Sequence, residues 1–191
     1  MKQAKLLTQA EQKRGNTLIN GHRYPTRNHT IFAFSFYAGL RACEIAALKV
    51  GDVFDADGAV RDTVYLAAGQ TKGDEVNTVL VSRRLEKALV AFAAAYPRHI
   101  SNPNAALFFS AKRGGFSAQT IVNLFARFYA LAGIKGASSH SGRRQFLTEL
   151  ADKGVNVRVI HALARHKDIS TTQRYIDYNE SKLRNAIELV R

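Results

Sequence analysis

The strongest constraint on the fold is a long apolar segment, residues 26–38, which ends at Gly39. Its side chains leave little polar surface at helical spacing: Ile31, Phe32, Phe34, Ser35 and Phe36. A second segment opens at Ser117 and closes at Gly133, and it repeats apolar residues at the 3.6-residue period: Ile121, Leu124, Phe125, Phe128 and Leu131. These two segments predict a mainly helical protein.

Capping residues and helix breakers predict further helices on both sides of this pair. Thr8 is followed three residues later by Glu11, the pattern of a capping box. The expected helices are 8–20, 41–48, 83–96 and 138–154, a short helix capped by Asn156, and a helix capped by Ser170 that carries Tyr175.

Residues 51–82 differ in character from the helical segments. Turn patterns at 55–58 and 70–75 each precede a short β-prone run, 60–66 and 78–81 respectively, and a third strand is expected at 107–110. The predicted fold class is therefore mainly α with a small antiparallel β-sheet (α+β), and 191 residues fit one domain.

The chain is strongly basic, with 28 Lys and Arg against 15 Asp and Glu and a net charge of +13. Such an excess favours a polyanionic partner, because each phosphate that is neutralised releases condensed counterions. The alternative is a soluble basic protein that has no nucleic-acid partner.

The single cysteine, Cys43, excludes an internal disulfide framework and fits a reducing compartment. No apolar stretch approaches the length of a membrane span, and the N-terminus does not resemble a signal peptide. We therefore expect a cytoplasmic protein of a bacterium-like cell with no membrane partner.

Two segments near the C-terminus carry residues that suit covalent phosphodiester chemistry without a metal. His140-Ser-Gly-Arg143 and the run from His166 to Tyr175 supply a tyrosine, two histidines and an arginine within 36 residues. On a helix, His140 and Arg143 share a face, whereas Arg144 is rotated by about 100°. For His140 and Arg143 alone, the competing interpretation is a solvated surface pair.

Three segments in the same order resemble the sequence boxes of the tyrosine recombinases, the phage integrase family. Tyr37-Ala-Gly-Leu-Arg41-Ala-Cys-Glu44-Ile resembles the first arginine box, and His140-Ser-Gly-Arg143 resembles the His-x-x-Arg box. The run from Leu163 to Tyr175 resembles the C-terminal box, which ends in the nucleophile. The resemblance begins at Leu7-Thr8 and continues to the C-terminus.

The resemblance implies the catalytic-domain fold of this family and a role for each matching residue. Tyr175 would attack the scissile phosphate and leave a 3′-phosphotyrosyl link, so that rejoining needs no ATP, metal or other cofactor. Arg41 and Arg143 would bind the non-bridging oxygens, because a planar guanidinium matches phosphate in two places.

The remaining implied roles concern proton transfer and support. His140 resembles the acid–base histidine, His166 would hydrogen-bond the phosphate and orient the tyrosine, and Lys72 would be the general acid. Turn lysines are usually only solvated, so Lys72 has a plain alternative. Glu44 would support Arg41 or a neighbouring backbone group.

Several other residues are weighed as binding or metal-ligating candidates. Further DNA contacts are expected from His22, Arg23, Arg144 and Arg174, although a solvated loop explains His22 and Arg23 equally well. Asp52, Asp55 and Asp57 lack the full spacing of a calcium loop and are interpreted as turn residues. His161 is interpreted as a helix-surface or packing residue.

Members of this family usually carry an N-terminal core-binding domain, and we expect none within this sequence. We expect a single catalytic domain over 1–191 with a tail over 1–6, either a naturally short recombinase or an excised fragment. An apolar stripe predicts a C-terminal helix over 180–191 that packs in cis or on a neighbouring protomer: Leu183, Ala186, Ile187 and Val190.

The expected function is site-specific recombination of double-stranded DNA, encoded by a bacterium, a phage or a mobile element. The resemblance implies a homotetramer on paired sites, and a monomer or weak oligomer in free solution. Two alternatives stay open. One is a type IB topoisomerase that relaxes supercoils as a monomer, and the other is a catalytically silent DNA-binding regulator of the same fold.

Overall fold

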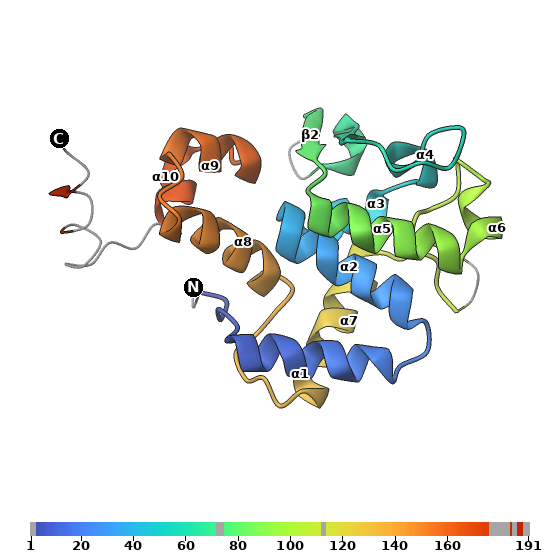
Figure 1. Cartoon of the computed structure of the whole chain (residues 1–191), viewed down its shortest axis with the longest axis horizontal. Helices are drawn as coiled ribbons and strands as arrows, with labels where there is room; N and C mark the ends of the chain where they lie inside the picture. The colour runs from blue at the N-terminus through green and yellow to red at the C-terminus, as the bar shows by residue number, and fades with distance from the viewer. Residues whose placement is uncertain (1–2, 72–74, 112–113, 176–183, 185–186, 189–191) are drawn as a thin grey trace. The chain divides into compact units, whose positions relative to one another are not determined.

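A computed structural model describes residues 3–71, 75–111, 114–175, 184, 187 and 188 (Figure 1). The chain divides into two compact units, Met1–Phe146 and Leu147–Arg191. The division falls within helix α8 (Ser141–Asp152).

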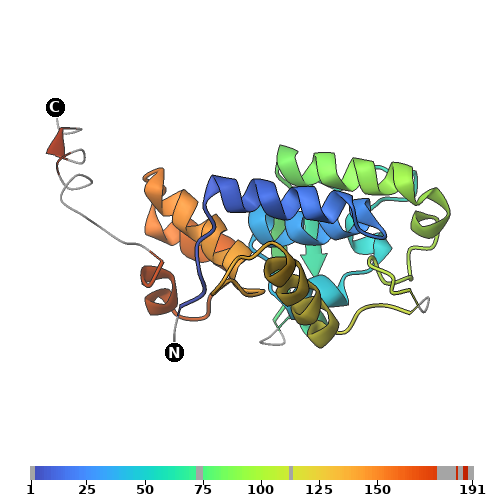
Figure 2. The same cartoon turned by 90° about the horizontal axis from the view of Figure 1, so that it is seen from below.

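Four helices enclose the core of the first unit: α1 (Gln9–Asn20), α2 (Pro25–Ala38), α5 (Arg83–Ala95) and α7 (Ala118–Leu131). Helices α2 and α5 lie side by side, and α1 lies along α2 (Figure 2). The ring of Phe32 contacts four other rings at centroid distances of 4.4 to 6.3 Å: Phe36, Phe125, Phe128 and Tyr129. The apolar segment 26–38 is thus a central helix, as predicted.

The predicted caps of α1 and α7 are confirmed. The Thr8 hydroxyl accepts from the Glu11 amide, and the Glu11 carboxylate accepts from the Thr8 amide, which completes the capping box of α1. Ser117 caps α7 through the amide of Thr120. Each cap satisfies backbone donors that have no partner inside the helix.

Shorter elements connect these helices: α3 (Ala42–Ala47), α4 (Val50–Val53), the 3₁₀ helix η1 (Ala68–Gln70) and α6 (Pro97–Ile100). Strands β1 (Thr63–Leu66) and β2 (Asn77–Leu80) pair antiparallel, with Val64 opposite Val79. The predicted small antiparallel sheet is confirmed.

The third strand predicted at 107–110 is wrong for the described residues. Ala106 and Phe109 form only isolated bridges, to Lys49 and Gly115. Leu107 and Phe108 are both buried, so the segment lacks the alternation of a strand with one solvated face. The segment instead packs beside the α3–α4 connection, where the Leu107 amide donates to the Leu48 carbonyl.

The second unit contains the C-terminal part of α8, α9 (Val157–Ala164) and α10 (Ile169–Gln173). Asn156 caps α9, as predicted. The predicted cap of the next helix is wrong: Asp168, not Ser170, caps α10, because its carboxylate accepts from the Ser170 amide at 2.8 Å. Since α10 ends at Gln173, Tyr175 lies just after the helix.

The predicted C-terminal helix over 180–191 falls mostly outside the described residues, so its packing stays a prediction. Within the part of the chain that the structure describes, none of the helices has the length and apolar character needed to cross a bilayer.

Candidate active site

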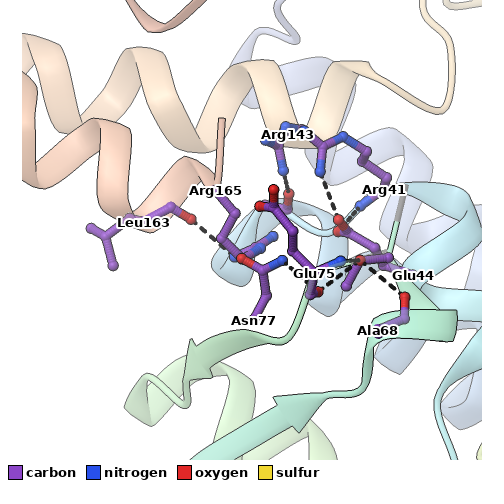
Figure 3. Close-up of polar contacts among 10 residues, drawn as sticks. Arg41, Glu44, Ala68, Glu75, Asn77, Arg143, Leu163 and Arg165 are labelled. Atoms are coloured by element: carbon purple, nitrogen blue, oxygen red, sulfur yellow. Dashed lines mark hydrogen bonds and ion pairs between the residues drawn. The ribbon is translucent and has the colours of Figure 1, made fainter. Parts of the chain in front are cut away.

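Arg41 lies directly before α3 and is held by a buried carboxylate. Gly39 ends α2 with a φ of +63°, which turns the chain toward α3. The Arg41 amide and its Nη1 donate to the two oxygens of Glu44, at 2.8 and 2.7 Å (Figure 3). The Glu44 side chain is 1% exposed and that of Arg41 is 21% exposed, so the pair is largely shielded from water. This contact is what a supporting role for Glu44 requires.

Arg143 lies in the first turn of α8 and is buried, with 4% of its surface exposed. Its Nη1 donates to the carbonyl oxygen of Gly39 at 2.5 Å (Figure 3). A solvated surface role is therefore excluded for Arg143. The short segment from Gly39 to Glu44 holds the guanidinium groups of both Arg41 and Arg143.

Gly142 allows α8 to approach α2 closely enough for this contact. A Cβ atom at Gly142 would lie 2.3 Å from the Ser35 Oγ and 2.9 Å from a ring carbon of Phe36. Ser35 is a fully buried small residue on α2. Any larger residue at 142 would push the first turn of α8, and Arg143 with it, away from Gly39.

His140 does not share the environment of Arg143. Helix α8 begins at Ser141, so His140 precedes it, and the His140 carbonyl accepts from the Arg144 amide at 2.9 Å. The predicted helix start at 138 is thus too early, because Ser138 accepts from the His140 amide outside the helix. His140 is exposed, while Arg143 is buried.

Lys72 lies outside the described residues, but both flanks of its turn are described. Gln70 donates to the Ala47 carbonyl at 2.8 Å and to the Asp52 carboxylate at 2.7 Å. The Thr71 hydroxyl donates to the Glu75 carbonyl at 2.8 Å. The bonds of Gln70 join the N-terminal flank to the end of α3 and to α4. The role of Lys72 stays a prediction.

His166 and Tyr175 come together in the second unit. Their rings stack with a centroid distance of 5.7 Å and an interplanar angle of 18°. The Nδ1 of His166 lies 2.8 Å from the Oγ1 of Thr172, and the Tyr175 amide donates to the Thr172 carbonyl at 3.0 Å. Thr172 thus contacts both His166 and Tyr175, the two residues of the C-terminal box that are predicted to be catalytic.

His161 also contacts Thr172, and the sequence did not reveal this. Its Nδ1 lies 3.1 Å from the same Oγ1. His161 is half-buried on α9, so the interpretation as a surface or packing residue missed a polar contact. No helical spacing links residues 161 and 172, because the turn between α9 and α10 separates them.

Asp168 is an acidic residue close in sequence to His166 and Thr172. The backbone amide and hydroxyl of Ser170 donate to its carboxylate and hold the pKa of Asp168 below its ordinary value. The charges of His161 and Arg174 act in the same direction.

The four residues predicted to contact DNA have different local surroundings, and their binding role stays a prediction. The His22 ring meets Phe128 edge-on at 5.1 Å, and the Arg23 guanidinium lies over the Tyr24 ring at 4.9 Å. Arg144 donates to the Ala4 carbonyl, and Arg174 follows the last residue of α10.

Metal ligation finds no support in the residues that the structure describes, since none of their His, Cys, Asp and Glu side chains form a group of three suited to a metal ion. Asp55 accepts from the amides of Asp57 and Ala59 at 3.0 and 2.8 Å. Asp55 and Asp57 therefore act as turn residues, as interpreted from the sequence. The same interpretation is wrong for Asp52, which lies in α4, where its carboxylate accepts from the Lys49 amide at 2.8 Å.

The chain is similar to known proteins over nearly its whole length. The model of the Phage integrase family matches residues 5–182. Tyrosine recombinase XerA of Thermococcus kodakarensis is 30% identical over 187 residues, which are 96% of this chain and 62% of that protein. Tyrosine recombinase XerC of Syntrophus aciditrophicus is 24% identical over 164 residues, which are 82% of this chain and 51% of that protein.

Solved structures show the same fold. The crystal structure of XerA recombinase matches with a TM-score of 0.76 and 27% identity, over 100% of this chain and 66% of that one. The Tn1549 transposon integrase in complex with circular intermediate DNA matches with a TM-score of 0.74 and 18% identity, over 100% of this chain and 68% of that one. XerH bound to its difH substrate matches with a TM-score of 0.72 and 19% identity, over 98% of this chain and 55% of that one. The predicted fold is confirmed. The chain spans 51% and 62% of the lengths of the two curated relatives named above.

Proposed function

The chain belongs to the phage integrase family, and we propose that it is a site-specific DNA recombinase, whose catalytic domain cuts and rejoins DNA through a 3′-phosphotyrosyl intermediate. The activity of the whole protein is part of this proposal, because the chain matches only part of the length of its relatives. It also covers the single catalytic domain over 1–191 and the cytoplasmic location.

The observation that carries the proposal is that the Gly39–Glu44 segment orients two guanidinium groups, that of Arg41 within it and that of Arg143 on α8. Arg143 is buried and oriented by the Gly39 carbonyl, and Arg41 is oriented by Glu44. Preorganised cationic donors of this kind stabilise charge that develops on phosphate oxygens, and they cost no reorganisation during the reaction.

In the proposed reaction the Tyr175 oxygen attacks the phosphorus atom and a tyrosyl–phosphate bond forms. The bond from phosphorus to the 5′-oxygen breaks, and Lys72 supplies the proton that the departing oxygen takes up. His140 acts as acid and base for the tyrosine, and His166 donates to a phosphate oxygen. Rejoining reverses these steps with another 5′-hydroxyl, so the chemistry uses no metal, ATP or other cofactor.

The proposed partner is double-stranded DNA. The net charge of +13 favours a polyanion, and the structurally similar XerH and Tn1549 integrase were solved with DNA. Strand exchange joins two duplexes, so we propose a homotetramer on paired sites and a monomer or weak oligomer in free solution. Repeated identical contacts close such an assembly into a ring.

Covalent trapping tests this function directly. Nicked suicide duplexes drawn from the DNA that flanks the gene are incubated with wild type, Tyr175→Phe and the control Tyr65→Phe. Tyr65 is an exposed tyrosine on β1, with 64% of its surface accessible. We expect wild type and Tyr65→Phe to show a covalent complex on denaturing gels. Tyr175→Phe should show none, although its affinity for DNA should equal that of wild type.

Two other outcomes would point to the alternatives. DNA binding without any trapping in wild type would contradict the recombinase proposal and favour a regulator. Trapping together with relaxation of supercoiled DNA by the monomer, and no exchange between paired sites, would favour a type IB topoisomerase.

A further inference from the structure

The hydroxyl of Thr172 lies between two imidazole rings. Its Oγ1 is 2.8 Å from the Nδ1 of His166 and 3.1 Å from the Nδ1 of His161. Thr172 has no exposed surface, so water does not compete for this hydroxyl. The three side chains come from α9, the turn after it and α10, all within the second unit.

Counting protons couples the two histidines. A threonine hydroxyl has one hydrogen to donate and two lone pairs that accept. It can donate to only one of the two Nδ1 atoms, so at least one imidazole must carry a hydrogen at Nδ1 and donate to Oγ1. The tautomer of either ring therefore limits the tautomer of the other.

The tautomer of His166 decides what this ring can offer to a substrate. When the Thr172 hydroxyl donates to the Nδ1 of His166, the neutral ring carries its hydrogen at Nε2. The Nε2 atom is then a donor on the side of the ring away from Thr172. When His166 instead donates from Nδ1, its neutral form has only an acceptor at Nε2 and cannot donate to a phosphate oxygen.

The two distances favour the first arrangement. The contact of Thr172 to His166 is the shorter of the two, as expected where the hydroxyl is the donor, because O–H donors form shorter hydrogen bonds than N–H donors. In addition, the His166 ring stacks on Tyr175, so that its orientation affects the position of the tyrosine ring.

We propose that His161 is a positioning residue, which donates from Nδ1 to the Thr172 hydroxyl and thereby fixes the ring orientation and the Nε2–H tautomer of His166. This inference rests on the proposed function for the role of His166 and Tyr175 in DNA cleavage. The hydrogen-bonded chain itself does not depend on that function. His161, Thr172 and His166 then act as one unit.

Nitrogen NMR of the imidazole rings tests the chain without DNA. The 191-residue chain is labelled with ¹⁵N in its six histidines, and the His166 signals are assigned through His166→Gln. Spectra are compared at about pH 8 for wild type, His161→Phe, Thr172→Val and His161→Asn. The matched control is Thr171→Val, the neighbouring threonine on the same helix.

We expect wild-type His166 to be the Nε2–H tautomer and to become a tautomer mixture in His161→Phe and Thr172→Val. Thr171→Val should leave it unchanged, and His161→Asn should preserve it, because the asparagine amide can donate from nearly the same position as Nδ1. In the trapping assay, His161→Phe and Thr172→Val should slow covalent complex formation by roughly 10- to 100-fold, as expected for a misplaced catalytic group.

An unchanged His166 tautomer in both His161→Phe and Thr172→Val would overturn the inference. Thr172→Val keeps the side-chain shape and removes only the hydroxyl, so it decides the question if His161→Phe does not fold. If wild type is never trapped on DNA, the proposed function fails, whereas the NMR comparison still decides the role of His161.

Discussion

Arg143 and Tyr175 are held in place by different kinds of contact. Arg143 depends on a partner 104 residues away, the Gly39 carbonyl, and on the close approach of Gly142 to Ser35. Tyr175 stacks on His166, whose partner Thr172 lies only six residues further along the chain. The first arrangement requires the folded core of its unit, and the second requires only a short run of sequence.

This difference suggests that the two regions respond to different perturbations. Packing changes between α2 and α8 should disturb the arginine region through the core. Loss of single hydrogen bonds should disturb the tyrosine region and leave the global stability nearly intact. Three variants test this contrast, in order of decreasing expected effect.

The largest effect is expected from Arg143→Lys. A lysine keeps the positive charge but loses the planar guanidinium group, which can donate to the Gly39 carbonyl and to a phosphate oxygen at the same time. We expect covalent complex formation to slow by about 10²- to 10³-fold, the usual cost of losing one preorganised donor. Single-turnover trapping measures the rate.

The matched control is Arg127→Lys, an exposed arginine on α7. It should change the trapping rate by less than about threefold, since the charge is kept and an exposed side chain contributes little. Equal slowing by both substitutions would show that a general effect of replacing arginine by lysine, rather than the position of Arg143, controls the rate.

An intermediate effect is expected from Gly142→Ala. The new methyl group would meet the Ser35 Oγ and the Phe36 ring, and overpacking of this kind costs about 1–3 kcal/mol of unfolding free energy. Gly15→Ala, inside α1 with no atom within 4 Å of the new Cβ, should instead stabilise by about 0.5–1 kcal/mol. Urea unfolding measures both, and the contrast fails if the two variants change in the same direction.

The smallest effect is expected from Asp168→Asn. Folding lowers the pKa of Asp168 below 3.8, so the folded state binds fewer protons than the unfolded chain between the two pKa values. The contribution of Asp168 to the stability of the folded state is thus fully present above pH 3.8, and it is lost as the pH falls through the pKa of the folded state. Asparagine keeps the cap but does not titrate.

Hydrogen exchange of the α10 amides, compared at about pH 3 and about pH 6 after correction for intrinsic rates, measures this effect. Wild type should lose protection at the lower pH, and Asp168→Asn should lose less. A variant that loses protection to the same extent as wild type would show that another group controls the acid response of α10.

Local pattern was sufficient for the helices and for their caps at Thr8, Ser117 and Asn156, because each cap acts over two or three residues. It failed at Ser170, because a competing acceptor, Asp168, lies two residues earlier and takes the Ser170 amide. It also failed at 107–110, where a β-prone run packs beside the α3–α4 connection and does not join the sheet. Propensity describes a segment, and it does not select the partner of that segment.

By itself, the sequence determined the helical class, the small sheet, the basic charge and the boxes that carry Arg41, Arg143, His166 and Tyr175. These features depend on the identity and spacing of neighbouring residues. Only the tertiary structure decided that Arg143 is buried against Gly39, that Gly142 must be small beside Ser35, and that two histidines share one hydroxyl. The reason is physical: these contacts join residues that come together only when helices pack, and no periodicity along the chain records which groups will meet.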